Sequence, residues 1–547
     1  MANAHQFETH RVENQPVALG AYNAWSTDLA LREAVQREGG GWAAKQLDAY
    51  GHLVGGELIA HGFAANENRP VLRAFDAYGR RVDEVEFHPS YHRLMAAAMQ
   101  HGMNGFAWNH QEQAGAQVAR AAILYMGSQA DAGTACPMSM THAAIPALRH
   151  ASQLAQRWIP KLLSADYDPR SVPMEQKTGC TIGMGMTEKQ GGSDVRANTT
   201  RATRSADGSY QIVGHKWFYS APMCDAHLVL AQAEQGISCF LVPRFCPDGS
   251  RNATVLQRLK NKLGDWSNAS SEVEFCGAHG ELVGQEGRGI ATIIEMVSLT
   301  RLDCMVSSAA QMRQATIQAL HHTRQRRAFG KALIDQPLMR NVLADLALES
   351  EAAVALAMRI ARAVDASARS DHESALARLG TAVGKYWICK RTPAHVNEAQ
   401  ECLGGLGYVE DSIMPRLYRQ APLNSIWEGS GNVQCLDVLR AIGRDASARD
   451  ALFAELRTSG GQVREYDAGL VELAGLLDDT ASLEYRSRFV VERIALMLQA
   501  SLLLRASEPS IAAAFCRSRI GGRHGLALGT LDVNAPVDRL IERADVV

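Results

Sequence analysis

The sequence lacks several features that would place it in particular classes of protein. Its longest apolar run, residues 494–504, covers about eleven residues, whereas a membrane-spanning helix needs about 20. That run therefore predicts a buried helix. The start of the chain is polar and has no apolar stretch typical of a secretion signal. The 11 cysteines include no CxxC pair, which argues against a disulfide framework or a metal site and favours the cytoplasm.

The chain also lacks an excess of charge of either sign. It has 56 Lys and Arg against 58 Asp and Glu, so the molecule as a whole is not a basic nucleic-acid binder, and such a surface would be a local patch. Apolar residues make up 46% and charged residues 21%, which excludes a disordered or collagen-like chain. A length of 547 residues predicts three or four domains.

The periodicity of apolar residues changes twice along the chain. Helical spacing dominates residues 1–180, short alternating strands fill 181–284, and long helices return over 285–444. Four long helices, at 288–327, 336–368, 373–401 and 430–443, predict a four-helix bundle. We therefore predict an α+β multidomain fold: an N-terminal helical domain, a β barrel or sandwich, the bundle, and an extra helical module over 445–547. No βαβ alternation supports a Rossmann fold.

Three segments could carry chemistry. The first, GMGMTEKQGGSD at 183–194, is either a linker between domains or a loop whose backbone N–H groups and hydroxyls face a polar cofactor. The second, QRRAFGK at 325–331, is either a solvated helix end or a phosphate site at Arg326, because guanidinium groups bind phosphate with charge assistance.

The third segment contains LGGLGY at 403–408 and NSIWEGSGN at 424–432. Glu428 follows a bulky Trp427 and precedes a predicted helix. A partly desolvated carboxylate has a raised pKa, which suits a general base. Alternatively, Glu428 merely complements the positive end of the helix dipole.

In this order and domain context, the segments resemble the motifs of the acyl-CoA dehydrogenase family. MTEKQGGSD is similar to that family's TEPxAGSD loop and GHKWFYS to its GxKxWIT strand. RRAFG with a later Gln resembles RxxFG…Q, LGGLGY resembles GGxGY, and IWEGSGN resembles IYEGTxE. The resemblance covers residues 1–444. It extends to the AidB branch, flavoproteins of the bacterial adaptive response to alkylation damage.

The resemblance implies FAD as the cofactor, a homotetramer and a set of residues around the flavin. Residues expected at the isoalloxazine ring are Met184, Met186, Thr187, Gly192, Ser193, Phe218, Tyr219 and Ser220. Residues expected to contact the FAD of a neighbouring subunit are Arg326, Phe329, Gln336, Gly404 and Gly405. Residues expected to close over the cofactor are Ser425, Trp427, Gly429, Ser430 and Asn432.

The resemblance also places the catalytic base. Glu428 occupies the family's usual base position, and the alternative position on the first bundle helix is Thr300, which carries no carboxylate. The family's Tyr is Trp427 here, its Thr is Ser430, and its flavin-covering Trp is Phe218. These departures do not affect FAD binding, but the larger indole predicts a narrowed acyl tunnel.

The C-terminal module suggests a nucleic-acid surface. Its basic residues are all Arg, and they gather near residues 505–523, although acids slightly outnumber them over the whole module. The AidB branch implies binding of double-stranded DNA and weak dehydrogenation of isovaleryl-CoA. Candidate phosphate contacts are Arg440, Arg444, Arg517, Arg519 and Arg523.

Two interpretations of the module remain. The arginines could instead form ion pairs with acids of their own module, such as Asp478, Asp479 and Glu484. In that case the protein would be a metabolic, cytosolic acyl-CoA dehydrogenase with a C-terminal extension and no DNA role. The module has no Lys-rich amphipathic face of the kind that binds membranes.

Overall fold

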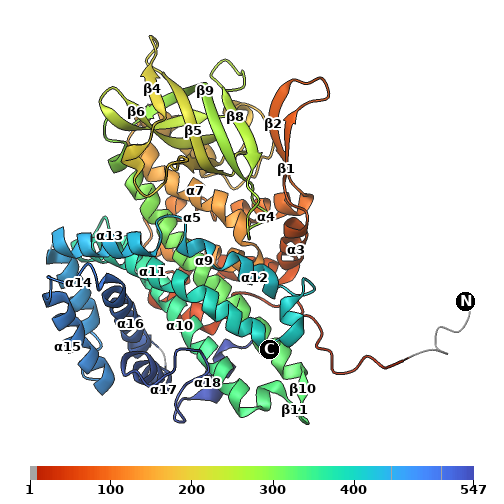
Figure 1. The fold of residues 1–547 in the computed structure, drawn as a ribbon, viewed down its shortest axis with the longest axis vertical. Coiled ribbons are helices and arrows are strands. Elements are labelled where there is room, and N and C mark those ends of the chain that lie inside the picture. Colours follow the sequence, from red (N-terminus) through yellow and green to blue (C-terminus); the bar gives the residue numbers. More distant parts are fainter. Residues whose placement is uncertain (1–8, 445, 507, 547) are drawn as a thin grey trace, which may run out of the picture.

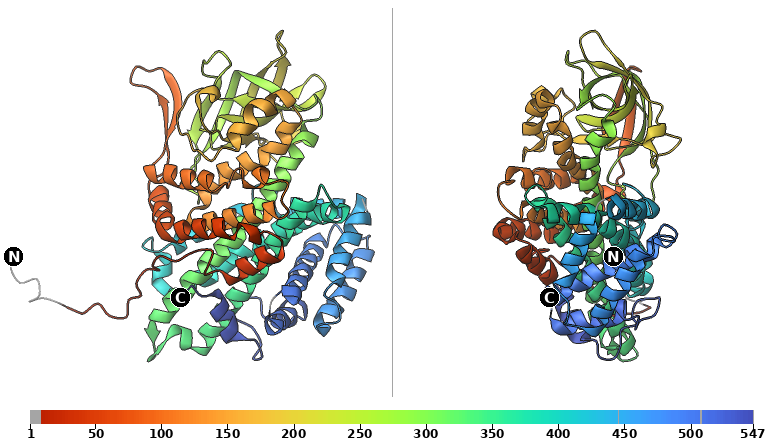
Figure 2. Two further views of the ribbon diagram at one scale, coloured as in Figure 1. Left: turned by 180° about the vertical axis from the view of Figure 1, so that it is seen from behind. Right: turned by 90° about the vertical axis from the view of Figure 1, so that its left-hand side faces the viewer.

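A computed structural model describes residues 9–444, 446–506 and 508–546. The first part of the chain is a layer of helices interrupted by one β hairpin (Figures 1 and 2). Its elements are α1 Leu29–Arg37, α2 Ala44–Leu53, α3 Ile59–Glu67, β1 Val71–Phe75, β2 Arg81–Glu86, α4 Pro89–Gln100, α5 Phe106–Asn109, α6 Ala116–Ala130, α7 Ala132–Arg149 and α8 Ser152–Leu162. The expectation of helices alone over 1–180 is wrong at 71–86. There the chain forms the hairpin, and β1 packs against β8 of the β domain.

The strand-rich segment folds into a small barrel at the top of Figure 1. Its strands are β3 Ile182–Gly185, β4 Arg201–Arg204, β5 Tyr210–Ser220, β6 Ala226–Ala233, β7 Gly236–Pro243, β8 Thr254–Leu259 and β9 Ser270–Val283. The sheet runs in the order β3-β6-β4-β5-β9-β7, and β7 also pairs with β6, which closes the path. Strands β3 and β8 each pair with one neighbour only and keep a free edge among the described strands.

The helices that follow the barrel form the lower half of the molecule. They are α9 Gly289–Gln325, α10 Pro337–Ala366, α11 Asp371–Glu401, α12 Met414–Gln420 and α13 Gly431–Arg444, with a short ribbon of β10 Arg327–Ala328 and β11 Lys331–Ala332. The four predicted long helices match α9, α10, α11 and α13 within about two residues. Helix α9 runs from the barrel through the centre of the molecule and packs against α6, α7, α10 and α11.

The C-terminal module is helical and lies against the bundle. It contains α14 Ala446–Arg457, α15 Arg464–Asp478, α16 Ser487–Ala506, α17 Pro509–Phe515 and α18 Val537–Ala544. The apolar run at 494–504 lies within α16 and is buried there, as predicted. The predicted fold class is therefore confirmed, whereas the division into four independent domains stays a prediction. Within the described residues, no helix is long and apolar enough to cross a membrane.

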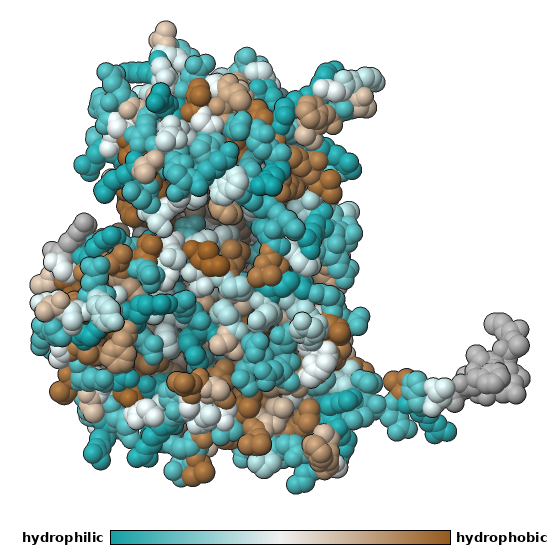
Figure 3. Space-filling model, in the orientation of Figure 1, coloured by the Kyte–Doolittle hydropathy of each residue, from teal (hydrophilic) through white to brown (hydrophobic). Residues whose placement is uncertain are grey.

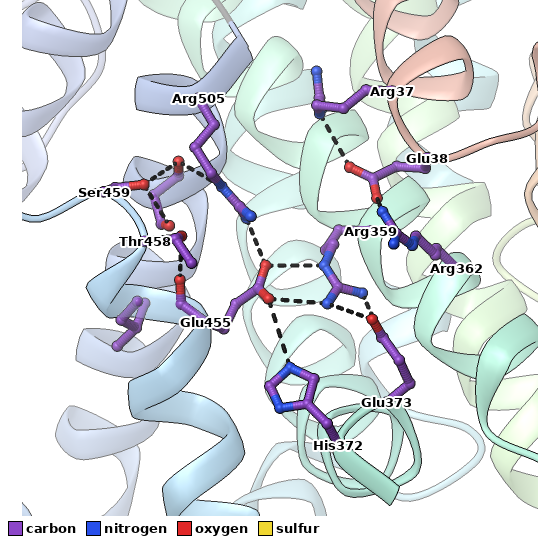
Figure 4. Close-up of polar contacts among 12 residues, drawn as sticks. Arg37, Glu38, Arg359, Arg362, His372, Glu373, Glu455, Thr458, Ser459 and Arg505 are labelled. Atoms are coloured by element: carbon purple, nitrogen blue, oxygen red, sulfur yellow. Dashed lines mark hydrogen bonds and ion pairs between the residues drawn. The ribbon is translucent and has the colours of Figure 1, made fainter. Parts of the chain in front are cut away.

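Buried ion pairs join the module to the bundle. Figure 4 shows Arg359 of α10 between Glu455 of α14 and Glu373 of α11, at 2.9 and 2.8 Å. Arg505 of α16 also contacts Glu455, at 2.5 Å, and His372 lies 4.0 Å away. Burial alone would raise the pKa of Glu455, but the hydrogen bonds and charges of Arg359 and Arg505 lower it to about 2. We call this contact zone between module and bundle the seam.

Two further arginines of the module extend the seam. Arg519 contacts Glu349 of α10 at 2.8 Å and also Asp345, while Arg391 of α11 reaches the same Glu349 at 2.8 Å. Arg543 of α18 binds Glu351 of α10 at 2.8 Å and Glu33 of α1 at 2.6 Å. Breaking such a buried pair leaves an uncompensated charge, so these contacts fix how the module docks.

Candidate functional site

A cavity of about 1580 Å³ lies between the barrel and the helical half, and Figure 3 shows the surface hollowed at this level. Its walls come from the 183–194 loop, β5, α7, α9 and the segment before α13. A pocket for one drug-sized ligand has roughly 300–1,000 Å³, so this cavity has room for more than one bound group.

The 183–194 loop forms the barrel side of the cavity. Its predicted cofactor residues all line the space, namely Met184, Met186, Thr187, Gly192 and Ser193. Glu188 holds the loop in place: its buried carboxylate accepts hydrogen bonds from Lys216 Nζ at 2.9 Å and from the backbone N–H of Thr199 at 2.7 Å. Burial lowers the pKa of Lys216 to about 8, and the hydrogen bond and charge of Glu188 oppose that shift. Two of the sequence motifs are thus joined by one buried ion pair.

Strand β5 contributes alternate side chains to the cavity, because successive residues of a strand face opposite sides. Phe218 and Ser220 line it, and the Phe218 ring is 53% exposed. Tyr219 points the other way, into the barrel, where its ring stacks on His227 at 3.7 Å between centroids. Tyr219 is therefore not part of the cavity wall, and its expected place around the isoalloxazine ring stays a prediction.

Glu428 faces the cavity opposite α9. Its Oε2 accepts a hydrogen bond from Thr300 Oγ at 2.8 Å, and its backbone carbonyl accepts one from Arg301 Nε at 2.9 Å. Burial raises the pKa of this carboxyl, and the Thr300 hydrogen bond and the charges of Lys385 and Arg301 only partly oppose that shift. Glu428 also precedes α13, which begins at Gly431, so both interpretations of the sequence stay open. A desolvated carboxylate with a raised pKa is suited to removing a proton.

The backbone around Glu428 is held by a residue that the motifs did not reveal. Glu428 has φ +58°, a left-handed conformation that is strained for a residue with a side chain. The buried ammonium of Lys385 donates to the carbonyl of Trp427 at 2.7 Å and to that of Gly429. Gln434 Nε2 donates to the carbonyl of Glu428 at 3.0 Å. The one signal in the sequence is a lysine within the apolar helical run AVGKYWIC.

The remaining predicted residues of the 424–432 segment divide into two groups. Trp427, Gly429 and Ser430 line the cavity. Ser425 instead donates to the carbonyl of Pro422 at 2.9 Å, and Asn432 is exposed at the start of α13, so the structure does not bring these two into the cavity wall.

Of the residues expected to contact a neighbouring subunit, Arg326, Phe329 and Gln336 lie just beyond the C-terminal end of α9, and Gly404 and Gly405 follow α11. Arg326 is 26 residues beyond Thr300, or about 39 Å along a helix axis. Its guanidinium contacts the Asn14 carbonyl, and Gln336 donates to the Ala328 carbonyl at 3.1 Å. Phe329 is 99% exposed. Gly404 and Gly405 are not part of the cavity wall either. Arg326 therefore lies far along α9 from the cavity residues of its own chain. That Arg326, Phe329, Gln336, Gly404 and Gly405 contact the cofactor of a neighbouring subunit stays a prediction.

The five candidate DNA contacts have different surroundings. Arg440 lies at the cavity and pairs with Asp437 at 2.7 Å. Arg517 pairs with Asp532 at 2.8 Å, and Arg523 is exposed. Arg519 is 7% exposed and paired to acids of α10, so the prediction that it contacts phosphate is wrong. The side chain of Arg444 lies outside the described residues.

The cavity residues fit a flavin ring. Phe218 offers an exposed apolar face, and the hydroxyls of Thr187 and Ser220 offer hydrogen bonds to polar ring edges. Gly192 packs closely on Thr187, since a Cβ at this position would lie 2.4 Å from Thr187 Oγ. The loop thus stays thin beside the cavity. Among the described residues, no cluster of His, Cys, Asp or Glu could hold a metal ion.

Comparison with protein-family models gives three matches along the chain. Residues 14–169 match "Adaptive response protein AidB N-terminal domain". Residues 183–277 match "Acyl-CoA dehydrogenase, middle domain", and residues 287–443 match "Acyl-CoA dehydrogenase, C-terminal domain".

Similar proteins and structures cover almost the whole chain. "Putative acyl-CoA dehydrogenase AidB" of Escherichia coli (strain K12) is 48% identical over 95% of this chain and 96% of its own length. The crystal structure of Caenorhabditis elegans ACDH-11 in complex with C11-CoA has a TM-score of 0.87 at 26% identity, covering 95% of both chains. The apo form of Bd2924 has a TM-score of 0.81 at 27% identity, covering 94% of this chain and all of that one.

Proposed function

The chain belongs to the acyl-CoA dehydrogenase family, in its AidB branch, and from this premise we propose that it oxidises a short, branched acyl-CoA such as isovaleryl-CoA. Enzymes of this family are flavin-dependent oxidoreductases, so the predictions of that enzyme class and of FAD are confirmed by family membership. The observation that carries the proposal is Glu428, a desolvated carboxylate in a cavity that fits a flavin.

The residues of this chain divide the work of α,β-dehydrogenation. Glu428 removes the proton from the α-carbon, and its raised pKa makes the resulting carboxylic acid stable enough to hold that proton. Thr300 orients the carboxylate, while Lys385 and Gln434 hold the strained backbone behind it. Thr187, Phe218 and Ser220 bind the ring of the cofactor. Bound FAD supplies the acceptor for the hydride that leaves the β-carbon.

A short, branched acyl group is favoured by the residue next to the base. Trp427 lines the cavity where the family motif has a smaller ring, and its indole N–H donates to Asn424 Oδ1 at 2.8 Å, which fixes the ring. A fixed indole narrows the space beside Glu428. C11-CoA is bound by the C. elegans relative, so chain length is the property to measure.

The test is anaerobic reduction of the purified flavoprotein by acyl-CoA thioesters. We expect a yellow protein whose flavin absorbance is bleached by isovaleryl-CoA faster than by a long straight-chain thioester. A colourless protein that cannot be reconstituted with FAD would overturn the cofactor assignment for this chain. Flavin that no acyl-CoA reduces would overturn the dehydrogenase assignment and leave the cofactor assignment intact.

A homotetramer is proposed from exposed apolar side chains in the segments that follow α9 and α11. Phe329, Leu338 and Tyr408 are 99%, 84% and 84% exposed. If a second copy covered these side chains, Arg326, Gln336, Gly404 and Gly405 of this chain would contact the cofactor bound in that second copy. Light scattering measures the number of copies in the assembly. The substitution Arg326→Ala should weaken FAD binding, since a charge-assisted hydrogen bond contributes about 1.5–3 kcal/mol.

DNA binding in the response to alkylation damage is a second proposal. It is favoured by the match of residues 14–169 to the AidB N-terminal domain. Of the described candidate residues, Arg440, Arg517 and Arg523 remain. Phosphate contacts release counterions, so the affinity for double-stranded DNA should fall with salt and show little dependence on sequence. The free thiols of all 11 cysteines favour a reducing cytoplasm for either role.

The DNA proposal is tested by a double substitution at the module surface. Arg517→Ala with Arg523→Ala should weaken binding to all sequences alike and flatten the salt dependence. Arg32→Ala, an exposed arginine on α1, is the matched control and should change neither. If the double variant binds DNA like the wild type, Arg517 and Arg523 are not the contacts. If the wild type itself binds no DNA, the metabolic enzyme with no DNA role is the better description.

A further inference from the structure

A segment of extended chain, residues 9–20, precedes the first helix and crosses the C-terminal end of α9. We call it the arm. It contains no helix or strand, and its residues 9–13 are exposed and run away from the body of the molecule (Figures 1 and 2). Farther along, the Val17 N–H donates to Gln325 Oε1 at 3.0 Å, and His321 Nε2 lies 2.9 Å from the Val17 carbonyl oxygen. These contacts hold the arm against the last turns of α9.

Asn14 attaches the arm to the segment that follows α9. Its Oδ1 accepts a hydrogen bond from the backbone N–H of Arg327 at 2.7 Å, and its Nδ2 donates to the Arg327 carbonyl at 2.9 Å. The side-chain amide is thus paired with both polar backbone groups of one residue. Asn14 has φ +55°, a left-handed conformation that asparagine adopts more readily than most residues. The arm is therefore clamped at the residue next to Arg326.

The clamp also orients the guanidinium of Arg326. Both Arg326 and Arg327 donate to neutral backbone carbonyls, and the acceptor for Arg326 is the carbonyl of Asn14. Neither arginine forms an ion pair among the described residues, whereas Arg324, two residues earlier, is paired with Asp545. A carbonyl fixes the direction of a guanidinium without cancelling its charge. The two arginines therefore keep their attraction for an anion.

The two arginines lie too far from the cavity of their own chain to bind a group held there. Arg326 is about 39 Å from Thr300 along the axis of α9. Its side chain is half-buried, and that of Arg327 is exposed. A guanidinium binds phosphate through charge-assisted hydrogen bonds, so the two arginines suit a phosphate-bearing ligand that arrives from outside the chain. In the proposed function, that ligand is the FAD bound in a second copy.

We propose, on the basis of the FAD and the homotetramer proposed above, that the arm is part of the cofactor site between two copies. Asn14 is the positioning residue, because its clamp and its carbonyl present the Arg326 guanidinium to the diphosphate of the neighbouring FAD. Without the clamp, this segment would have to be ordered when the cofactor binds. Ordering one such side chain weakens binding by about two- to tenfold.

The experiment measures the dissociation constant of FAD on the full-length flavoprotein, from the flavin fluorescence released on dilution. Asn14→Gly removes the clamp and suits the left-handed backbone, so the fold should be kept. The dissociation constant should rise about two- to tenfold. Gln15→Gly is the control, because it loosens the arm equally and removes a neighbouring exposed amide. It should leave the constant unchanged, and equal effects of the two substitutions would overturn the role of Asn14.

A double-substitution cycle shows whether Asn14 acts through Arg326. Arg326→Ala alone should weaken FAD binding about ten- to a hundredfold, as expected for the loss of a charge-assisted hydrogen bond. Adding Asn14→Gly to Arg326→Ala should cause no further loss, because residues that act together are not additive. A merely structural role of Asn14 would weaken binding by the same factor in both backgrounds, and that result would overturn the proposal.

A change of charge gives a second test of the same residue. Asn14→Asp keeps the size of the side chain but places a carboxylate beside Arg326 and Arg327. An ion pair formed there would cancel the charge that the diphosphate meets, so FAD should bind more weakly than to Asn14→Gly. Tighter binding to Asn14→Asp than to Asn14→Gly would overturn the anion site.

Failure of this proposal and failure of the proposed function give different results. If Arg326→Ala leaves FAD binding unchanged, the contact with a neighbouring cofactor is overturned, and the role of Asn14 with it. If Arg326→Ala weakens FAD binding but Asn14→Gly does not, the role of Asn14 alone is overturned. If Asn14→Gly weakens binding of double-stranded DNA and not of FAD, the arm belongs to a DNA surface, which also overturns the proposal.

Discussion

The cavity and the seam both bury charge, but they treat it in opposite ways. In the seam, Glu455 lies between Arg359 and Arg505, and its pKa falls to about 2 (Figure 4). At the cavity, the Glu428 carboxylate accepts a hydrogen bond from the Thr300 hydroxyl and none from a guanidinium, and burial raises the pKa of Glu428. The ion pair therefore makes a carboxylate permanently charged and structural, whereas the hydroxyl leaves one able to exchange a proton.

The two regions also differ in what they leave unpaired. Glu349 of the seam contacts both Arg391 and Arg519. Asp303 and Gln311 of the cavity wall instead have buried oxygens, Oδ2 and Oε1, without hydrogen-bond partners among the described residues. Buried polar groups in folded proteins are usually paired, and exceptions call for an explanation such as ligand binding.

The largest expected effect separates the two carboxylates by chemistry. Glu428→Gln should slow flavin reduction by an acyl-CoA about 10²–10⁴-fold, because the amide keeps the shape and loses the basicity. Stopped-flow absorbance measures the rate, and the FAD content should not change. Glu234→Gln, in an exposed hairpin of the barrel, is the control. A wild-type rate in the Glu428 variant would mean that another base acts.

The next effect concerns stability in the seam. Arg519→Met leaves Asp345 and Glu349 with less or no compensation, and loss of one partner from a buried pair costs about 3–5 kcal/mol. Thermal or urea unfolding should show this loss, while flavin reduction per bound FAD stays unchanged. An unaltered melting temperature, accompanied by weaker DNA binding, would restore Arg519 to the DNA surface.

Acid should weaken the seam in a defined pH range. Glu455 has a folded pKa of about 2, below the ordinary value of about 4.3, so its pairing stabilises the fold above pH 4.3 and is lost as the pH falls toward 2. A shift of about two units corresponds to about 3 kcal/mol. Between pH 6 and 2, the free energy of unfolding should fall less steeply with pH in Glu455→Gln than in the wild type. At pH 6 the variant should already be less stable. Identical slopes would contradict the pairing.

The smallest effect is a shift in the pH dependence of catalysis. The rate of flavin reduction should rise with pH as Glu428 loses its proton, with a midpoint above the ordinary glutamate value. The charge of Lys385 opposes the raised pKa, so Lys385→Met should move that midpoint to higher pH. Lys390→Met, exposed on the same helix, should leave it in place. A purely structural role for Lys385 would lower stability without moving the midpoint.

The sequence by itself determined the family and most of the order of helices and strands, and it singled out Glu428, whose role as the base stays a prediction. Periodicity located α9, α10, α11 and α13, because long amphipathic helices repeat their apolar residues regularly. The motifs located Glu428 and most of the 183–194 loop, since a flavin needs a thin, polar backbone beside it. The hairpin at 71–86 was missed because it packs on a distant part of the chain.

Only the tertiary structure decided which side chains meet. Strand alternation turned Tyr219 into the barrel beside two residues that face the cavity. Arg519 looked like a surface cation in the sequence, yet its partners Asp345 and Glu349 lie about 170 residues away on α10. Lys385 carries no motif, because its role depends on carbonyls of the separate segment around Glu428. Ion pairs between distant residues, and the burial of their side chains, depend on how the helices pack. The order of residues along the chain does not predict that packing.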